Sequence, residues 1–404
     1  LASAAMNRPG EILREAAAGS LNSQSIKGEM KMSAIRLRAF ASGFLAVLFA
    51  ASFLCGQATS GNTKHLLYVA SPGIRNYVEY GGVGILVFDI DHGYRFVKRI
   101  PTWTFLPGQK VENVKGIAAS AKTGRVYVTS LTRMMALDAV TGKVLWDRAY
   151  EGGCDRLAIT PDGKTLYVPQ LEGELWNVVN AATGAVIKKI ETNSGSHNTI
   201  CSLDGKQAYL AGLRSPLLSV VDTRSKKVVR QVGPFSGSVR PFTVNGSNTL
   251  CFVNVNGLLG FEVGDLRTGR KLYSVPVQGF PPGPVKRHGC PSHGIALSPD
   301  ERELWVADGA NHMIHIFDVT AMPPRQMSSV KVRDLPGWIS FSLDGRFAYS
   351  STGEIIDATT KKIVAALQDE EGRQVQSEKL LELTITNGKV VHAGNQFGVG
   401  MKRK

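Results

Sequence analysis

The sequence predicts an all-β protein, a seven-bladed β-propeller in which the N-terminal and C-terminal strands together complete one blade. Two observations carry this prediction. Helix-period stretches are nearly absent after residue 60, where short apolar segments alternate with turns. The chain also carries a degenerate repeat of about 42 residues. Its 43 glycines and 18 prolines are spread along all 404 residues, as many short strands joined by turns require.

The repeat consists of a short polar turn followed by an apolar strand with a central aromatic residue. The segment 161–168 (PDGKTLYV) shows it most clearly, and the aromatic position marks one blade in each copy. These positions are Tyr68, Tyr127, Tyr167, Tyr209, Phe252, Trp305 and Tyr349. Consecutive positions are 40 to 59 residues apart. Seven anchors therefore predict seven blades, each burying its faces on its neighbours.

A second strand pair is expected between consecutive anchors, joined by a turn that an aspartate begins. The aspartates are Asp89, Asp138, Asp222, Asp318 and Asp357. Thr-Gly or Thr-Lys follows several of them, so their side chains are expected to cap these turns.

The two ends of the repeat region are complementary. The strand at 65–69 lacks an inner strand before it, and the inner strand at 380–385 lacks an outer pair after it. We therefore expect these segments to share one blade, because an open ring would leave two unpaired sheet edges.

Some of these copies resemble a known family. Segments 162–168 and 220–222 are similar to the YVTN-type propeller repeat, and residues from about 62 to 400 resemble YncE-like seven-bladed proteins. This resemblance implies the fold but not the function, since such repeats occur in binding proteins, cell-surface proteins and enzyme subunits. Segment 136–146 is similar to a quinoprotein blade motif. It occurs once, so it supports the blade architecture, and no cofactor is expected.

The N-terminal region is expected to be a targeting segment. Basic residues Arg36 and Arg38 precede the apolar run 44–54, and small residues follow at Gly56 and Ala58. This pattern is typical of a signal peptide and predicts a periplasmic or secreted protein. A retained membrane anchor is the alternative, and after cleavage no stable membrane span is expected. The predicted organisation is a spurious or disordered extension at 1–31, a signal peptide at 32–58 and the propeller at 59–404.

The formal net charge of the chain is +14, but its lysines and arginines are scattered over turns. No basic run interleaved with aromatic residues occurs, so no nucleic-acid partner is expected. We interpret the charge as a solvated basic surface, with the footprint of an anionic partner as the alternative. Four cysteines remain after the signal peptide, Cys154, Cys201, Cys251 and Cys290. They form no disulfide framework or zinc spacing, and their disulfide status is left open.

Aligning the inner strands predicts a ring of polar residues at one mouth of the propeller channel. The position two residues before Leu157 and its counterparts are Lys115, Asp155, His197, Arg240, His293 and Gly337. The next position adds Arg156, Asn198 and Trp338, and the C-terminal strand adds Glu382 near the same level.

Two interpretations of this ring are open. The side chains could be solvated or paired with one another, Asp155 with Lys115 or Arg240 for example. The alternative is a binding site for a small anionic molecule or a protein segment, because converging cationic groups are costly unless a ligand completes them. The long loops 101–114 and 278–292 favour the interpretation as a ligand site. The second loop carries Lys286, Arg287, His288 and Cys290. No metal site is expected, since His197, His288, His293 and Asp155 come from different blades or loops.

The sequence does not identify catalytic residues or an oligomeric state. It contains no Gly-x-Ser-x-Gly elbow, phosphate loop or Cys-x-x-Cys-His haem motif. Segment 291–297 is similar to the inner-strand entry of sugar-lactonase repeats. A lactonase-like hydrolase is therefore the alternative to a binding module, with Arg240 holding an anion and His293 moving a proton.

Overall fold

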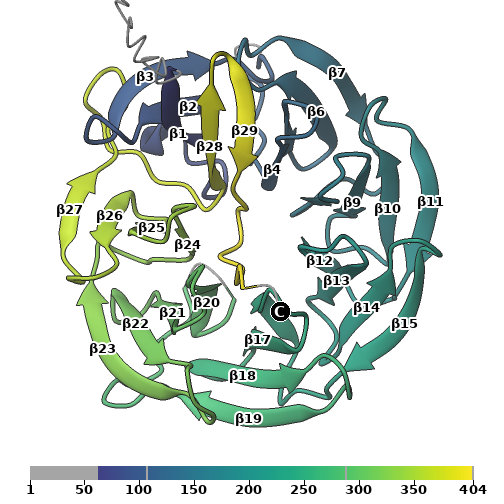
Figure 1. The fold of residues 1–404 in the computed structure, drawn as a ribbon, viewed down its shortest axis with the longest axis vertical. Coiled ribbons are helices and arrows are strands. Elements are labelled where there is room, and N and C mark those ends of the chain that lie inside the picture. The colour runs from purple at the N-terminus through teal and green to yellow at the C-terminus, as the bar shows by residue number, and fades with distance from the viewer. Residues whose placement is uncertain (1–61, 106–107, 287–288, 403–404) are drawn as a thin grey trace, which may run out of the picture. The chain divides into compact units, whose positions relative to one another are not determined.

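The computed structural model describes residues 62–105, 108–286 and 289–402. They form a ring of seven antiparallel blades, as Figure 1 shows along the ring axis. Six blades have four strands and one has five, which confirms the predicted fold class. The expected extension 1–31 and signal peptide 32–58 lie outside the described residues, as do Arg287 and His288. Among the described residues, no helix is long and apolar enough to cross a membrane.

Each blade runs from an inner strand at the axis to an outer strand at the rim. Blade 1 contains β1 (Thr63–Ser71), β2 (Gly84–Asp89), β3 (Arg95–Ile100), β28 (Leu380–Thr386) and β29 (Lys389–Ala393), with the short 3-10 helix η1 (Val78–Tyr80) between β1 and β2. Blade 2 contains β4 (Gly116–Ser120), β5 (Arg125–Thr129), β6 (Arg133–Asp138) and β7 (Val144–Ala149). Blade 3 contains β8 (Ala158–Ile159), β9 (Thr165–Pro169), β10 (Leu175–Asn180) and β11 (Val186–Glu191).

The remaining blades follow the same order. Blade 4 contains β12 (Ser196–Cys201), β13 (Gln207–Gly212), β14 (Leu218–Asp222) and β15 (Lys227–Val232). Blade 5 contains β16 (Val239–Val244), β17 (Leu250–Val255), β18 (Gly260–Asp265) and β19 (Lys271–Pro276). Blade 6 contains β20 (Ser292–Leu297), β21 (Glu303–Asp308), β22 (Met313–Asp318) and β23 (Arg325–Lys331). Blade 7 contains β24 (Ile339–Phe341), β25 (Phe347–Ser350), β26 (Glu354–Asp357) and β27 (Ile363–Ala366).

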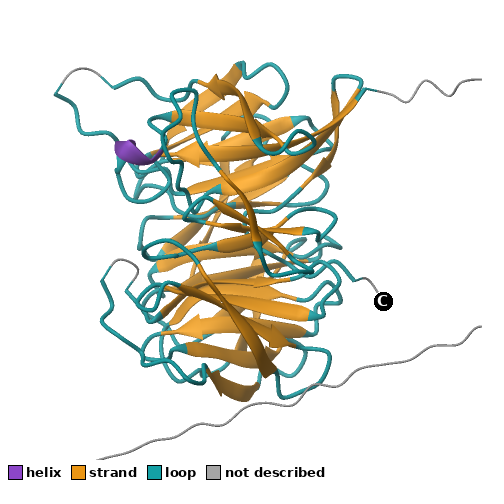
Figure 2. Cartoon of the chain, turned by 90° about the vertical axis from the view of Figure 1, so that its left-hand side faces the viewer, coloured by secondary structure: helices purple, strands orange, loops and turns teal. Residues whose placement is uncertain are grey.

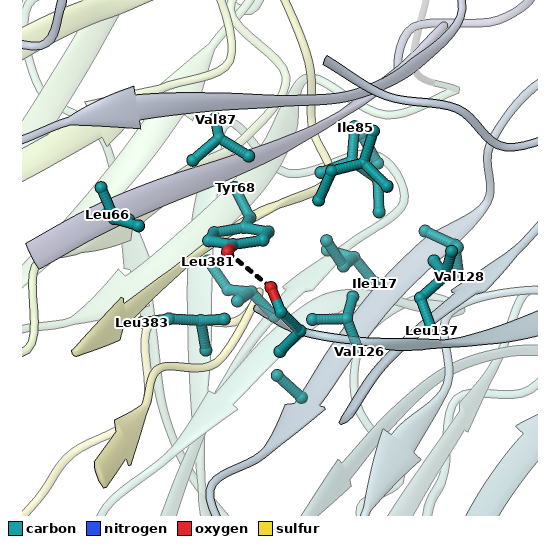
Figure 3. Packing of buried hydrophobic residues seen from close by; sticks show 14 of the residues in the cluster. Leu66, Tyr68, Ile85, Val87, Ile117, Val126, Val128, Leu137, Leu381 and Leu383 are labelled. Carbon is teal, nitrogen blue, oxygen red and sulfur yellow. Dashed lines mark hydrogen bonds between the residues drawn. The ribbon is translucent and has the colours of Figure 1, made fainter. Parts of the chain in front are cut away.

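The aromatic anchors are buried between blades, one in the second strand of each. Figure 3 shows the layer around Tyr68, where Ile85 and Val87 of blade 1 pack against Ile117 and Val126 of blade 2. The Tyr68 hydroxyl donates a 2.7 Å hydrogen bond to the Ala139 carbonyl of the next blade (dashed in Figure 3). Burying such a side chain stabilises the fold by about 1.5–3 kcal/mol, so this layer binds neighbouring blades together.

Aspartates hold two kinds of turn. In the turn between inner and second strand of blade 3, Asp162 Oδ1 accepts hydrogen bonds from Thr160 Oγ1 at 2.6 Å and from the Lys164 N–H at 3.0 Å. In the outer turn of blade 2, Asp138 Oδ1 accepts from the N–H groups of Val140 and Thr141. The predicted capping role of the outer-turn aspartates is confirmed.

Blade 1 is closed by both ends of the described chain. Strand β1 pairs on one side with β2 and on the other with β28, in a register that runs from Thr63↔Thr386 to Val69↔Leu380. The predicted closure is therefore confirmed. Strand β29, which the sequence did not suggest, adds a fifth strand beside β28.

A C-terminal tail (394–402) then crosses the ring axis, visible as the yellow trace that leaves β29 in Figure 1. Gln396 Oε1 accepts from the Ile117 N–H of blade 2 at 3.2 Å, and Gln396 Nε2 donates to the Leu157 carbonyl of blade 3 at 2.9 Å. The Trp338 indole donates to the Gln396 carbonyl at 2.6 Å. Phe397 is buried beside Trp338. The tail is thus part of the packed structure, with partners in several blades.

Candidate functional site

The predicted ring residues lie at the start of the inner strands, on one face of the ring. The connections from outer strand to next inner strand open on this face, and η1, purple in Figure 2, marks it. The C-terminal end of the tail emerges on the opposite face (Figure 2). We call the first face the polar mouth.

Asp155 is the centre of the first cluster in the polar mouth. Its side chain is fully buried, with Oδ2 2.6 Å from His197 Nδ1 and Oδ1 3.3 Å from Lys115 Nζ. Burial raises the pKa of Asp155, but the interaction with His197 and the charge of Lys115 outweigh it, so its pKa lies below the usual value. The three side chains come from blades 2, 3 and 4, and together they form one ion-paired unit.

The environment of His197 favours its neutral imidazole form. Burial lowers its pKa more than the Asp155 carboxylate raises it, and the charges of Lys115 and Arg240 lower it further. A neutral ring that donates its Nδ1 proton to the carboxylate keeps its lone pair on Nε2. His197 can therefore accept a proton or a hydrogen bond at neutral pH.

A second cluster joins blades 1, 3 and 7. Arg156 Nη2 lies 2.5 Å from Glu378 Oε2, and its guanidinium carbon lies 3.4 Å from the ring centroid of Trp338. Lys379 Nζ lies 3.0 Å from the same Glu378 oxygen and donates to the Gly73 carbonyl at 2.7 Å. Burial lowers the pKa of Lys379 to about 7, although the Glu378 carboxylate opposes this. Most of the charge in this cluster is satisfied within the protein.

The remaining ring residues lie beside these clusters. His293 Nδ1 lies 2.8 Å from the Gly337 carbonyl, and its ring centroid is 6.0 Å from that of Trp338. Arg240 lies near enough to Cys290 for its charge and a hydrogen bond to lower the thiol pKa, although burial raises that pKa to about 11. The charge of Arg240 therefore acts on both His197 and Cys290.

Eight of the nine predicted site residues are brought to this face, and Glu382 is not. Its Oε2 accepts from the Leu343 N–H at 2.9 Å and lies 3.4 Å from the Tyr349 hydroxyl, within the interface with blade 7. The prediction that Glu382 joins the ring is wrong, because the part of the C-terminal segment at ring level lies four residues earlier, at Glu378. Glu378 and Lys379 occupy the ring instead. Aligning Leu380 with Leu157 would have found them, since Glu378 then matches Asp155.

Asn198 is the exception among these paired groups. It is fully buried, and neither Oδ1 nor Nδ2 has a hydrogen-bonding partner among the described residues. Its backbone bridges to Arg156 of the neighbouring inner strand. A buried amide left without partners costs about 1–3 kcal/mol, so a bound molecule that supplies both a donor and an acceptor would be favoured here.

The comparisons with known proteins support no family assignment. No protein-family model matches the sequence, and no curated protein matches it. Among solved structures, a chain titled "Kuenenia stuttgartiensis Hydrazine Synthase" is similar, with 17% sequence identity and a TM-score of 0.42. The match covers 64% of this chain and 98% of that chain. Similarity at this level carries no inference about function, and the resemblance to YncE-like proteins stays a prediction.

The chemistry available at the polar mouth is that of hydrogen bonding, anion binding and proton transfer. No group of three or more His, Cys, Asp and Glu side chains in the described part of the chain is arranged to hold a metal ion. The four cysteines Cys154, Cys201, Cys251 and Cys290 are buried free thiols. Part of the long loop 101–114 packs on blade 2, where Trp103 Nε1 donates to Asp147 at 3.3 Å.

Proposed function

We propose that this protein is an exported, YncE-like β-propeller that acts as a binding module and holds a small anionic molecule, or an acidic segment of a partner protein, at the polar mouth. The buried and unpartnered amide of Asn198 is the observation that carries this proposal. It lies next to His197 in sequence, and its backbone bridges to Arg156.

The charge balance of the mouth supports an anion. The basic side chains are Lys115, Arg156, Arg240 and Lys379, and the carboxylates are Asp155 and Glu378. Lys379 is only partly charged at neutral pH because its pKa is about 7, but Lys115, Arg156 and Arg240 alone outnumber the two carboxylates. In this largely buried setting, charge-assisted hydrogen bonds to an anion are strong. Arg240 comes from blade 5 and its charge acts on His197, and we expect it to contribute to affinity.

The test is a thermal-shift and calorimetric screen of the purified protein with gluconate, citrate and inorganic phosphate. At least one should raise the melting temperature, and Arg240→Ala should weaken its binding by about tenfold or more. Arg267→Ala is the matched control, since Arg267 is exposed on the outer turn of blade 5. Equal binding by both variants, or no shift with any of these anions, contradicts the proposal.

A lactonase-like hydrolase is the second candidate, and the 2.6 Å contact between Asp155 and His197 favours it. A carboxylate that orients a neutral imidazole is a general-base arrangement, with His197 Nε2 removing a proton from an attacking water. Loss of lactone hydrolysis in His197→Ala, with anion binding retained, would support this function. His293→Ala tests the residue that the sequence suggested, and the absence of turnover between pH 5 and pH 9 would leave the binding module alone.

Export is part of the proposal and has its own test. N-terminal sequencing of the protein recovered from the periplasm or the medium should begin near residue 59. A protein recovered only from the cytoplasm with its N-terminal segment intact would contradict export.

A further inference from the structure

A cavity of about 300 Å³ lies on the opposite face of the ring from the polar mouth. It is lined by the ends of the inner strands of blades 2, 3, 4 and 7 and by the tail. The Gln396 side chain, bonded to blades 2 and 3, closes it toward the axis. We call this space the distal cavity. Its volume is at the lower end of the range for small-molecule sites.

The path of the tail determines the position of the distal cavity. The Gly400 N–H donates to the Val244 carbonyl of blade 5 at 3.0 Å, and the Met401 N–H donates to the Pro299 carbonyl of blade 6 at 3.1 Å. These bonds hold the tail over blades 5 and 6, so the strand ends of blades 2, 3 and 4 are left uncovered. The uncovered side is lined by small side chains, including Ala119, Ala121 and Ala158.

The wall of the cavity is mainly apolar. Leu203, Phe341 and Phe397 contribute large side chains to the lining, and the small alanine side chains leave space that a ligand would fill. An apolar body in this space would be removed from water, which is favourable in proportion to the area buried.

At this cavity, the copy of the repeat in blade 2 lacks a hydrogen bond that four other copies form. In blades 3, 4, 6 and 7 the hydroxyl that ends the inner strand donates to an aspartate two residues later. The pairs are Thr160–Asp162, Ser202–Asp204, Ser298–Asp300 and Ser342–Asp344, at 2.6 to 2.7 Å. In blade 2 the corresponding hydroxyl is Ser120, and the residue two positions later is Lys122.

This replacement has two consequences. Ser120 Oγ is buried and has no hydrogen-bonding partner among the described residues. A positive charge also stands where blades 3, 4, 6 and 7 carry a negative one, and both Ser120 and Lys122 line the distal cavity. A hydroxyl and an ammonium group beside an apolar space together suit a carboxylate attached to an apolar body.

We propose that the distal cavity binds a small amphipathic carboxylate, aromatic or aliphatic, with its carboxylate at Lys122 and Ser120 and its body against Leu203 and Phe397. This site is separate from the polar mouth, because Gln396 and the tail lie between them.

The experiment uses 8-anilino-1-naphthalenesulfonate as a fluorescent apolar anion and octanoate and benzoate as competitors. One probe molecule should bind per chain, and at least one carboxylate should displace it. Lys122→Asp restores the aspartate of the repeat, so it should weaken binding by about tenfold or more while leaving the melting temperature unchanged or raised. Lys206→Asp, an equal change of charge in the exposed turn of blade 4, should alter the affinity by less than about twofold.

Two further variants locate the probe. Ala121→Phe should fill the cavity and remove binding, and a melting temperature close to wild type shows that the fold is retained. Arg240→Ala should leave probe binding unchanged, because Arg240 belongs to the polar mouth. Loss of probe binding in Arg240→Ala but not in Lys122→Asp, or equal binding by Lys122→Asp and wild type, would overturn this inference.

Discussion

The two ends of the ring axis are built from the same inner strands but differ in chemistry. At the polar mouth, buried charges such as Asp155 and Arg156 are held by partners from other blades. At the distal end, the inner strands end in repeated turns in which a hydroxyl donates a hydrogen bond to an aspartate two residues later. Apolar side chains of the tail line the distal cavity there. The repeat therefore constrains the distal turns and leaves the strand starts free to vary. A departure from the repeat, such as Lys122, is informative only at the constrained end.

The largest effect should follow from removing a central charge of the polar mouth. Asp155→Ala leaves Lys115 and His197 without their shared carboxylate, and breaking a buried ion pair by removing one partner costs about 3–5 kcal/mol. Urea unfolding of variant and wild type measures this loss. Glu151→Ala removes an exposed partner of Lys189 and should cost under about 1 kcal/mol. Similar losses in both variants would mean that the mouth is no more tightly coupled than the surface.

The distal end should be weakened by loss of packing rather than charge. Phe397 is buried against Trp338, so Phe397→Ala should cost about 3 kcal/mol in the same unfolding assay. Val391→Ala in β29 is the control, since Val391 is exposed and should change stability by less than about 0.5 kcal/mol. A loss for Phe397→Ala as small as that of the control would show that the tail does not pack as described.

The polar mouth should also depend on pH in a way that the distal end does not. The folded-state pKa of Lys379 is about 7, against 10.5 for an ordinary lysine. Between these values the unfolded chain binds more protons than the folded one, so stability rises with pH, by at most about 1.4 kcal/mol per unit from this group. Unfolding at pH 7, 8 and 9 should give a smaller slope for Lys379→Met than for wild type. Equal slopes would exclude a depressed lysine pKa.

The smallest effect is expected at Asn198. Its amide forms no hydrogen bond with the described protein groups, so Asn198→Ala should change the stability of the ligand-free protein by less than about 1 kcal/mol. Asn254→Ala is the matched control, because Asn254 is equally buried but donates to the Gly260 carbonyl at 3.0 Å. Its loss should be larger, about 1–3 kcal/mol. If Asn198→Ala is the more damaging variant, the amide has a structural partner.

Much of the architecture could be predicted because each blade repeats one buried aromatic residue. Tyr167 and Tyr349 are each packed into the blade interfaces as their copies of the repeat suggested. The polar mouth could be predicted for a related reason, since a residue at a fixed distance before a repeated strand reaches the same end of the axis. Asp155 and His197 lie 42 positions apart in sequence and 2.6 Å apart in space.

The remaining features depend on contacts that no period records. Glu378 could not be predicted because β28 is not followed by the Asp-Gly turn that fixes the register of other inner strands. The tail has no repeated pattern, and its role rests on bonds from Gln396 to backbone groups of Ile117 and Leu157, far away in sequence. The tail forms part of the wall of the distal cavity, so the sequence alone could not indicate that Ser120 and Lys122 belong to one site.

The shared blade also sets an order of assembly. Strand β1 is among the first parts of the ring to be synthesised, but its inner partner β28 follows more than 300 residues later. At translation rates of about 5–20 residues per second, the inner edge of β1 remains without its partner for tens of seconds. An open strand edge is a template for pairing with other chains. The first blade begun is thus the last completed, and a nascent chain that stops before residue 380 leaves the ring unclosed.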